Sequence, residues 1–168
     1  TNLYKCFLPQ AWQFGGKAGI SAFVHPEGVY DDPNGNVFRE TLYSKLKKHF
    51  QFANELKLFQ EIHHRILFGI SIYCNKGGYD FETIANLYSV YTIEQCYDDS
   101  NTGEIPGIKD ENNNWNIKGH PGRIVHVGKT ELMLFAKLFD GSDNWKQARL
   151  PVLHAQALVD VLECFARQ

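Results

Sequence analysis

Two apolar runs of strand length constrain the fold of this chain more than any other feature. Residues 18–25 read Ala-Gly-Ile-Ser-Ala-Phe-Val-His before a proline, and residues 66–74 are almost continuously apolar and rich in isoleucine. Short apolar runs that stop at proline or asparagine are typical of buried strands, because proline donates no ladder hydrogen bond. We predict that residues 18–25 form a central strand, parallel to its neighbours in an open sheet. We predict that residues 66–74 form a strand buried on both faces.

The segments around these runs indicate helices, so the chain is predicted to be an α/β protein. Residues 37–49 place Phe38, Leu42 and Leu46 at steps of four, with charged residues on the other faces, which predicts an amphipathic helix. Residues 81–97 show no clean period and fit either a helix or a strand. Further expectations are a helix over residues 3–12, short extended pieces over 50–58, a strand over 123–127, a helix from Thr130, a helix ending at 166, and a long polar loop over 98–122.

Length, charge and cysteine content exclude several classes. A chain of 168 residues suits one medium domain, and 17 basic against 19 acidic residues leave a formal net charge of -2, so any nucleic-acid contact requires a local basic patch. No apolar run approaches the roughly 18 residues of a membrane span, so we expect no membrane partner. The four cysteines form no Cys-x-x-Cys pair, which favours a reducing, cytoplasmic location.

Three common kinds of site are not supported by spacing. The adjacent pair His63 and His64 would point to opposite faces of a strand, and no acids or thiols lie at ligand spacing, so no metal site is expected. No Gly-x-Ser-x-Gly elbow is present to position a nucleophile. The glycines at 15–16 precede a strand instead of following one, so they fit a helix end better than a phosphate loop.

Two groups of polar residues are candidates for function. The first follows the predicted strand 18–25, where open α/β sheets place their ligands, and is expected to form the wall of a substrate pocket. Its members are His25, Pro26, Glu27, Asp31 and Asp32. The alternative is that these residues are only structural: the histidine packs at the strand end, the glutamate is solvated, and an aspartate caps the following helix.

The second group is a basic cluster that could contact the DNA backbone. It consists of Arg39, Lys45, Lys47 and Lys48. The alternative is a helix face that is simply solvated.

The order of the predicted elements and the residue sequence of the first half resemble those of adenine-N6 DNA methyltransferases of restriction-modification systems, including large and nuclease-fused type II enzymes. In that family a helix leads into a glycine turn, a strand ending in proline, a helix, and a closing hairpin of the Rossmann-like sheet. The sequence similarity lies in residues 16–33 and 54–64, and it extends to residues 107–112 and 148–151. The resemblance covers most of the chain, and it implies a Rossmann-like methyltransferase fold.

The resemblance also indicates what this sequence lacks. The family binds S-adenosylmethionine through a glycine loop and clamps the flipped adenine with an Asn/Asp-Pro-Pro-Tyr/Phe motif, and neither is present here. The chain is therefore interpreted as a fragment C-terminal to the catalytic motif. Residues 1–78 would be the C-terminal half of the α/β methyltransferase domain, and residues 79–168 a polar and helical extension toward target recognition.

The expected activity belongs to the parent protein. It would transfer a methyl group from S-adenosylmethionine to adenine N6 in DNA, with the N-terminal remainder of the domain as a partner. The chain alone is expected to bind no cofactor and to be inactive. A noncatalytic DNA-binding or protein-interaction module is the alternative, and a small α/β enzyme using His25 and Glu27 is a third possibility.

Overall fold

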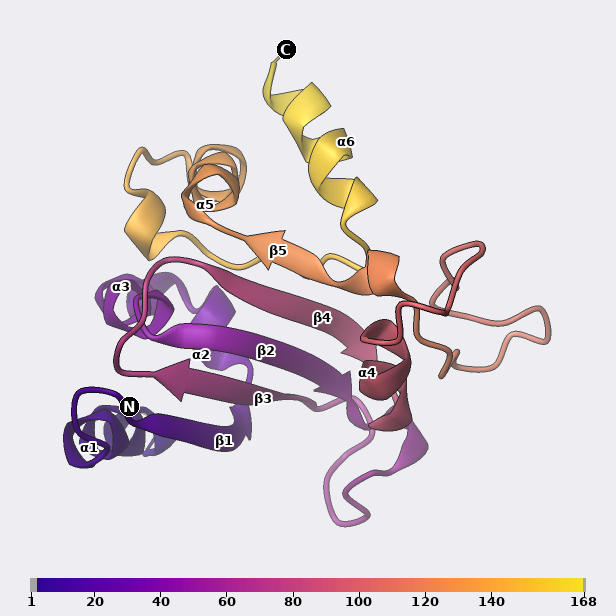
Figure 1. The fold of residues 1–168 in the computed structure, drawn as a ribbon, viewed down its shortest axis with the longest axis horizontal. Helices are drawn as coiled ribbons and strands as arrows, with labels where there is room; N and C mark the ends of the chain where they lie inside the picture. The colour runs from indigo at the N-terminus through magenta and orange to yellow at the C-terminus, as the bar shows by residue number, and fades with distance from the viewer. Residues whose placement is uncertain (1–2, 168) are drawn as a thin grey trace.

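The computed structural model describes residues 3–167 as a mixed sheet with helices around it (Figure 1). Five strands lie in the order β1-β3-β2-β4-β5. The strands are β1 (Ile20–Pro26), β2 (Leu46–Ala53), β3 (Leu67–Cys74), β4 (Phe81–Leu87) and β5 (Val125–Val127). The α-helices are α1 (Tyr4–Phe14), α2 (Gly28–Asp31), α3 (Asn36–Tyr43), α4 (Tyr91–Cys96), α5 (Lys129–Phe135) and α6 (Ala157–Ala166). The predicted α/β class is confirmed.

Three strands have their carboxyl ends on the same side of the sheet, because they run in the same direction. β3 is antiparallel to both β1 and β2, whereas β4 is parallel to β2 and antiparallel to β5. Consequently β1, β2 and β4 run in one direction, and their carboxyl ends lie on the same side of the sheet. Because β4 and β5 lie after residue 78, the sheet continues across the division expected at that position.

The position predicted for the first strand is wrong. β1 lies at the edge of the sheet, and its one partner among the described strands, β3, is antiparallel. The central position belongs to β2, which pairs with β3 on one side and β4 on the other. The prediction that β3 is buried on both faces is also wrong, because Ile70 and Ile72 stay half-buried.

The amphipathic helix predicted over residues 37–49 is too long. Helix α3 ends at Tyr43, and the chain enters β2 at Leu46. Steps of four and steps of two both fit Leu46 and Phe50, so the apolar pattern does not separate the two states. Ladder hydrogen bonds to two neighbouring strands decide the outcome in favour of a strand. Tertiary pairing therefore overrides the local helical pattern.

The remaining expectations are largely confirmed. The open segment 81–97 divides into β4 and α4, and the last helices lie at α5 and α6. Residues 98–120 form a long loop. Its one β-bridge among the described residues joins Lys109 and Trp115. Beyond α5 the chain makes one π-helix, Ala136–Asp140, and one 3-10 turn, Trp145–Gln147.

The two faces of the sheet are covered differently. On one face, hereafter the covered face, helices α1, α2, α3 and α5 bury Tyr73, Phe81, Val125 and Val127. On the opposite face, hereafter the open face, α4 packs on Phe50, while the part toward β1 stays exposed. No helix in residues 3–167 is long and apolar enough to cross a membrane.

Candidate functional site

A cluster of buried polar side chains lies on the covered face, just after β1. Glu27 follows the last residue of β1 and is 7% exposed. His49 and Gln51 project from β2, and Thr83 projects from β4 at the position that pairs with His49. All four are buried. Polar groups buried together in this way must satisfy one another, so their hydrogen bonds define the cluster.

The Glu27 carboxylate is the centre of these hydrogen bonds. His49 Nε2 lies 3.1 Å from each carboxylate oxygen, and Gln51 Nε2 donates to Oε2 at 3.1 Å. His49 Nδ1 lies 2.9 Å from the Thr83 hydroxyl, which occupies the other ring nitrogen. Because Nε2 faces the Glu27 carboxylate, it carries a proton and donates to that acid. The ring orientation of His49 is therefore fixed from both sides.

A second set of hydrogen bonds lies beside the first. The Tyr30 hydroxyl is 2.7 Å from Ser71 Oγ, and the Tyr30 ring lies 4.2 Å from the His49 ring between centroids. His25 Nε2 is 3.1 Å from the Tyr73 hydroxyl, and Tyr4 stacks on the His25 ring at 5.3 Å. Aromatic rings thus shield the Glu27 group from solvent.

Gly69 of β3 makes room for this arrangement. A Cβ atom at this position would lie 2.1 Å from Glu27 Oε1 and 3.1 Å from His49 Nε2. Such distances are shorter than real Cβ contacts, so any larger side chain must displace the carboxylate. The glycine in the apolar run of β3 is therefore required by the close approach of Glu27.

The surroundings change the acidity of several groups. Burial would raise the pKa of the Glu27 carboxyl, but the charge of His49 and the hydrogen bonds from His49 and Gln51 outweigh it, and the pKa falls below its ordinary 4.5. Burial lowers the pKa of His25 below its ordinary 6.5. Burial also raises the pKa of Tyr30 well above 10.0. At neutral pH the cluster therefore holds an ionised Glu27 beside a neutral His25.

A small cavity of about 50 Å³ lies next to the cluster. It is lined by Glu27, Tyr30, Asp31, His49, Gln51, Leu67, Thr83, Ala85, Leu150, Pro151 and Val152. Such a space admits a water molecule but no nucleobase or nucleoside cofactor. Within residues 3–167 no group of three or more His, Cys, Asp and Glu side chains is placed to hold a metal ion. The cluster can orient groups at the end of β1, and the lowered pKa of Glu27 makes that carboxylate a weak proton acceptor.

The structure places the five predicted pocket residues in different environments. Glu27 and Asp31 line the small cavity. His25 faces Tyr73 and the Pro26 carbonyl instead of Glu27, and the Pro26 side chain is exposed. Asp32 accepts hydrogen bonds from Lys5 Nζ and the Asn34 amide, both at 2.9 Å, so it acts as a cap. His25 and Glu27 are thus close but not hydrogen-bonded to each other.

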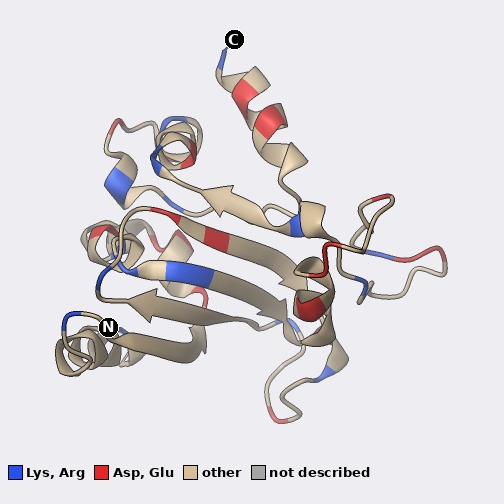
Figure 2. Ribbon diagram, in the orientation of Figure 1, with Lys and Arg blue, Asp and Glu red and all other residues tan. Residues whose placement is uncertain are grey.

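The four predicted basic residues do not form one helical face. Arg39 is 2% exposed on α3. Lys48, on β2, binds Glu82 at 2.8 Å, and Lys45 lies over the Trp12 ring. Lys47 lies at a β-bulge between Leu46 and Lys48. Figure 2 accordingly shows basic residues scattered over several elements with acidic residues between them.

Sequence reasoning missed His49, Gln51 and Thr83 as members of the site. A signal was present, because His49 and Gln51 alternate with Phe50 and Phe52 in the pattern of a strand. Assigning residues up to 49 to a helix separated His49 from this alternation. No sequence signal relates Thr83 to Glu27, because their proximity depends on the order of β2 and β4.

The fold and the site define the class as an α/β protein with a five-stranded mixed sheet and a buried carboxylate cluster. No protein-family profile matches the chain, and no curated protein matches it.

Proposed function

We propose that this chain is the C-terminal part of the catalytic domain of an adenine-N6 DNA methyltransferase. The observation that carries the proposal is the free edge of β1. This seven-residue strand, Ile-Ser-Ala-Phe-Val-His-Pro, has one described neighbour and contains no lysine or acid. Finished sheets normally protect an edge with charge, proline, a bulge or a covering segment, and β1 has a proline only at its last residue. An apolar edge without charge along its length supports continuation of the sheet by further strands.

The exposed side chains next to this edge support the same proposal. Ile20 is 74% and Val24 58% exposed on the open face, where Ile70 and Ile72 are half-buried. Doubly wound sheets are covered by helices on both faces, and the covered face already has its helices. We assign the open face and the β1 edge to the N-terminal remainder of the methyltransferase domain.

The order of the elements agrees with what the resemblance implies. Helix α1, strand β1 ending at Pro26, helix α3, and the antiparallel pair β2 and β3 follow one another along the chain. This is the succession of helix, strand, helix and closing hairpin described above for the family. The free edge of β1 lies on the side away from this hairpin, where the catalytic strand of the parent protein would pair.

The residues present here would hold neither the methyl donor nor the target base. A cavity of about 50 Å³ is too small for S-adenosylmethionine. In the parent protein this cofactor would supply the methyl group, and a loop upstream of this chain would bind it. The task left to Glu27, His49 and Gln51 is to fix the end of β1 and the turn into α2. In the parent protein this end would form one wall of the base or cofactor pocket, and DNA would be the substrate.

The alternative of a noncatalytic DNA-binding or interaction module receives less support. It requires Lys45, Lys47 and Lys48 to act together on one surface. Lys48 is neutralised by Glu82, and the three lysines occupy a helix-strand turn, a bulge and the open face. The free edge of β1 fits a missing part of a domain better than it fits a phosphate-binding surface.

The test uses the full polypeptide encoded by the natural gene. It is incubated with S-adenosylmethionine carrying a labelled methyl group and with duplex DNA, and N6-methyladenine is measured after digestion. We expect methylation by the wild type, loss of most activity in Val24→Lys, and retention in Val90→Lys, an equally apolar residue that is 51% exposed on the N-terminal side of α4. Absence of N6-methyladenine, or a gene with no coding sequence upstream of this segment, would contradict the proposal.

A further inference from the structure

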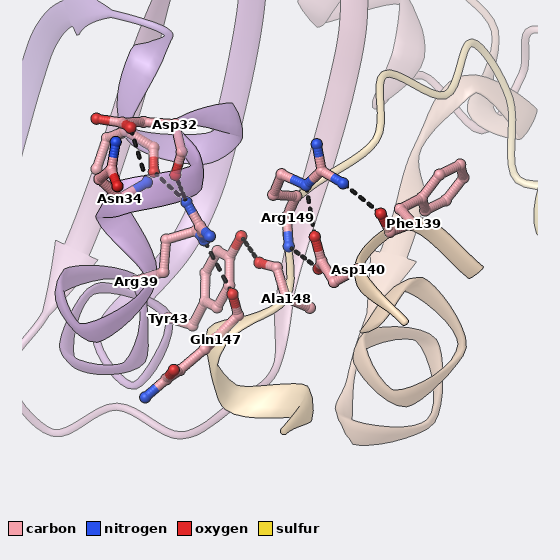
Figure 3. Close-up of polar contacts among 10 residues, drawn as sticks. Asp32, Asn34, Arg39, Tyr43, Phe139, Asp140, Gln147, Ala148 and Arg149 are labelled. Atoms are coloured by element: carbon pink, nitrogen blue, oxygen red, sulfur yellow. Dashed lines mark hydrogen bonds and ion pairs between the residues drawn. The ribbon is translucent and has the colours of Figure 1, made fainter. Parts of the chain in front are cut away.

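A hollow separate from the Glu27 cluster lies between the start of α3 and the end of the π-helix. Its volume is about 390 Å³. It is lined by Pro33, Asn36, Arg39, Phe139, Asp140, Ser142, Asn144, Gln147 and Arg149. Two guanidinium groups, two carboxamides of asparagine and one hydroxyl therefore surround the space, against one carboxylate. Figure 3 shows the polar contacts along these walls.

Arg39 lines this hollow although it is almost completely buried. Its Nε donates to the Gln147 carbonyl at 3.1 Å, and its Nη1 donates to the Asp32 carbonyl at 2.6 Å (Figure 3). Nη2 has no acceptor within residues 3–167, and Arg39 makes no ion pair there. The Nη2 group is therefore free to donate hydrogen bonds to an anion that enters the hollow.

Arg149 contributes the second guanidinium from the opposite wall. Its Nε pairs with Asp140, and its Nη2 donates to the Phe139 carbonyl (Figure 3). These contacts hold the side chain at the end of the π-helix, while 38% of it remains exposed and Nη1 has no acceptor in the described chain. The Asp140 carboxylate is used by Arg149 and by its backbone amide, so it leaves the hollow with a net positive charge.

Arg123 is the other large buried arginine and can be compared with Arg39. Arg123 also makes no ion pair in the described chain, but its Nη1 donates to the Lys118 carbonyl, and its Nη2 donates to the carbonyls of Ala85 and Asn86. Its two terminal nitrogens are thus satisfied by the fold, whereas its buried Nε has no partner in the described chain, and it lines neither of the two hollows described above. Arg39 has the same burial but keeps one terminal nitrogen beside an accessible space.

We propose that this hollow is a binding site for a phosphate group. Arg39 Nη2 and Arg149 Nη1 would bind its oxygens, and the first turn of α3, at Asn36, would add the positive end of an eight-residue helix. Tetrahedral oxyanions accept hydrogen bonds from several directions, which suits two arginines on different walls better than a planar carboxylate. The Asp32 carboxylate, which also feels the charge of Arg39, pairs with Lys5. This inference does not depend on the proposed methyltransferase function.

The first experiment titrates the chain with inorganic phosphate by calorimetry, at constant ionic strength set with sodium chloride. We expect binding by the wild type and binding at least about tenfold weaker in Arg149→Gln, because a charge-assisted hydrogen bond is lost. The control is Arg167→Gln, which removes an exposed arginine that is likewise paired with a single acid, Glu163. Phosphate should also raise the melting temperature of the wild type and not that of Arg149→Gln.

The second experiment identifies the molecule that carries the phosphate. Adenosine 5′-monophosphate and a short DNA duplex are each tested for displacement of inorganic phosphate. Displacement by the duplex that is lost in Arg149→Gln assigns a backbone phosphate, and displacement by the mononucleotide alone assigns a small ligand. Arg39→Lys, which keeps the charge but removes the second terminal nitrogen, should weaken binding if it folds. Absence of phosphate binding, or equal binding by the wild type and Arg149→Gln, overturns the proposal.

Discussion

The covered and open faces of the sheet each hold a carboxylate, and the two are held in different ways. On the covered face, Glu27 is 7% exposed and takes hydrogen bonds from His49 and Gln51, which are themselves buried. On the open face, Glu82 takes hydrogen bonds from Lys48 at 2.8 Å and Tyr97 at 2.6 Å, and 28% of its side chain is exposed. Both acids have a lowered pKa, because hydrogen-bond donors outweigh the effect of burial.

The difference between them lies in what happens when a partner is lost. Water can replace a lost donor at Glu82, so the exposed pair contributes little to stability. Water has little access to Glu27, so a lost donor leaves a buried charge or a buried hydrogen-bond donor unsatisfied. The covered face is therefore rigidly specified, whereas the open face tolerates change.

Gly69→Ala should have the largest effect, because the added methyl group would occupy the position of the Glu27 carboxylate. We expect a loss of about 2–4 kcal/mol in the free energy of unfolding, combining overpacking with disrupted buried hydrogen bonds. Urea denaturation measures the change. Gly78→Ala is the matched control, since a Cβ there meets nothing within 4 Å, and its effect should stay within about 0.5 kcal/mol. Equal stability of the two variants would contradict the packing described for Glu27.

Glu27→Gln and Glu82→Gln compare the two faces directly. At Glu27 the new amide group would oppose the donors of His49 and Gln51, and we expect a loss of about 1–3 kcal/mol. At Glu82 the loss should be below about 1 kcal/mol, because the Lys48 pair is partly exposed and screened. Thermal and urea unfolding of both variants measure the two losses in the free energy of unfolding. A larger loss at Glu82 would reverse the comparison.

The pH dependence of stability sharpens the contrast with a smaller effect. The folded-state pKa of His25 lies below the ordinary 6.5, so between these two values the unfolded chain binds more protons than the folded one. The free energy of unfolding should therefore decrease as the pH falls below 6.5, with half-buried His154 contributing in the same direction. Urea midpoints between pH 7 and pH 5 measure the slope. His25→Asn should flatten it.

Some features of the fold were predictable from particular segments. The apolar runs that became β1 and β3, the end of β1 at proline, and the helical spacing of α6 each depend on residues close together in sequence. The polar residues that interrupt the apolar pattern after β1 are likewise a local signal, and they mark Glu27 as a candidate. Other features were not local. Leu46 to Phe50 fits two periodicities, and pairing with β3 and β4 selects the strand.

The sequence by itself determined the α/β class, the approximate strands, and a polar segment at the end of the first one. Local propensity and apolar spacing suffice for these, because they depend on neighbours within a few residues. Only the tertiary structure decided that β1 is an edge strand, that His49 and Thr83 complete the Glu27 cluster, and that Arg39 and Arg149 line the same hollow. The residues of each of these groups lie 22 to 110 positions apart in the sequence, and strand order and helix packing bring them together, which no local pattern encodes.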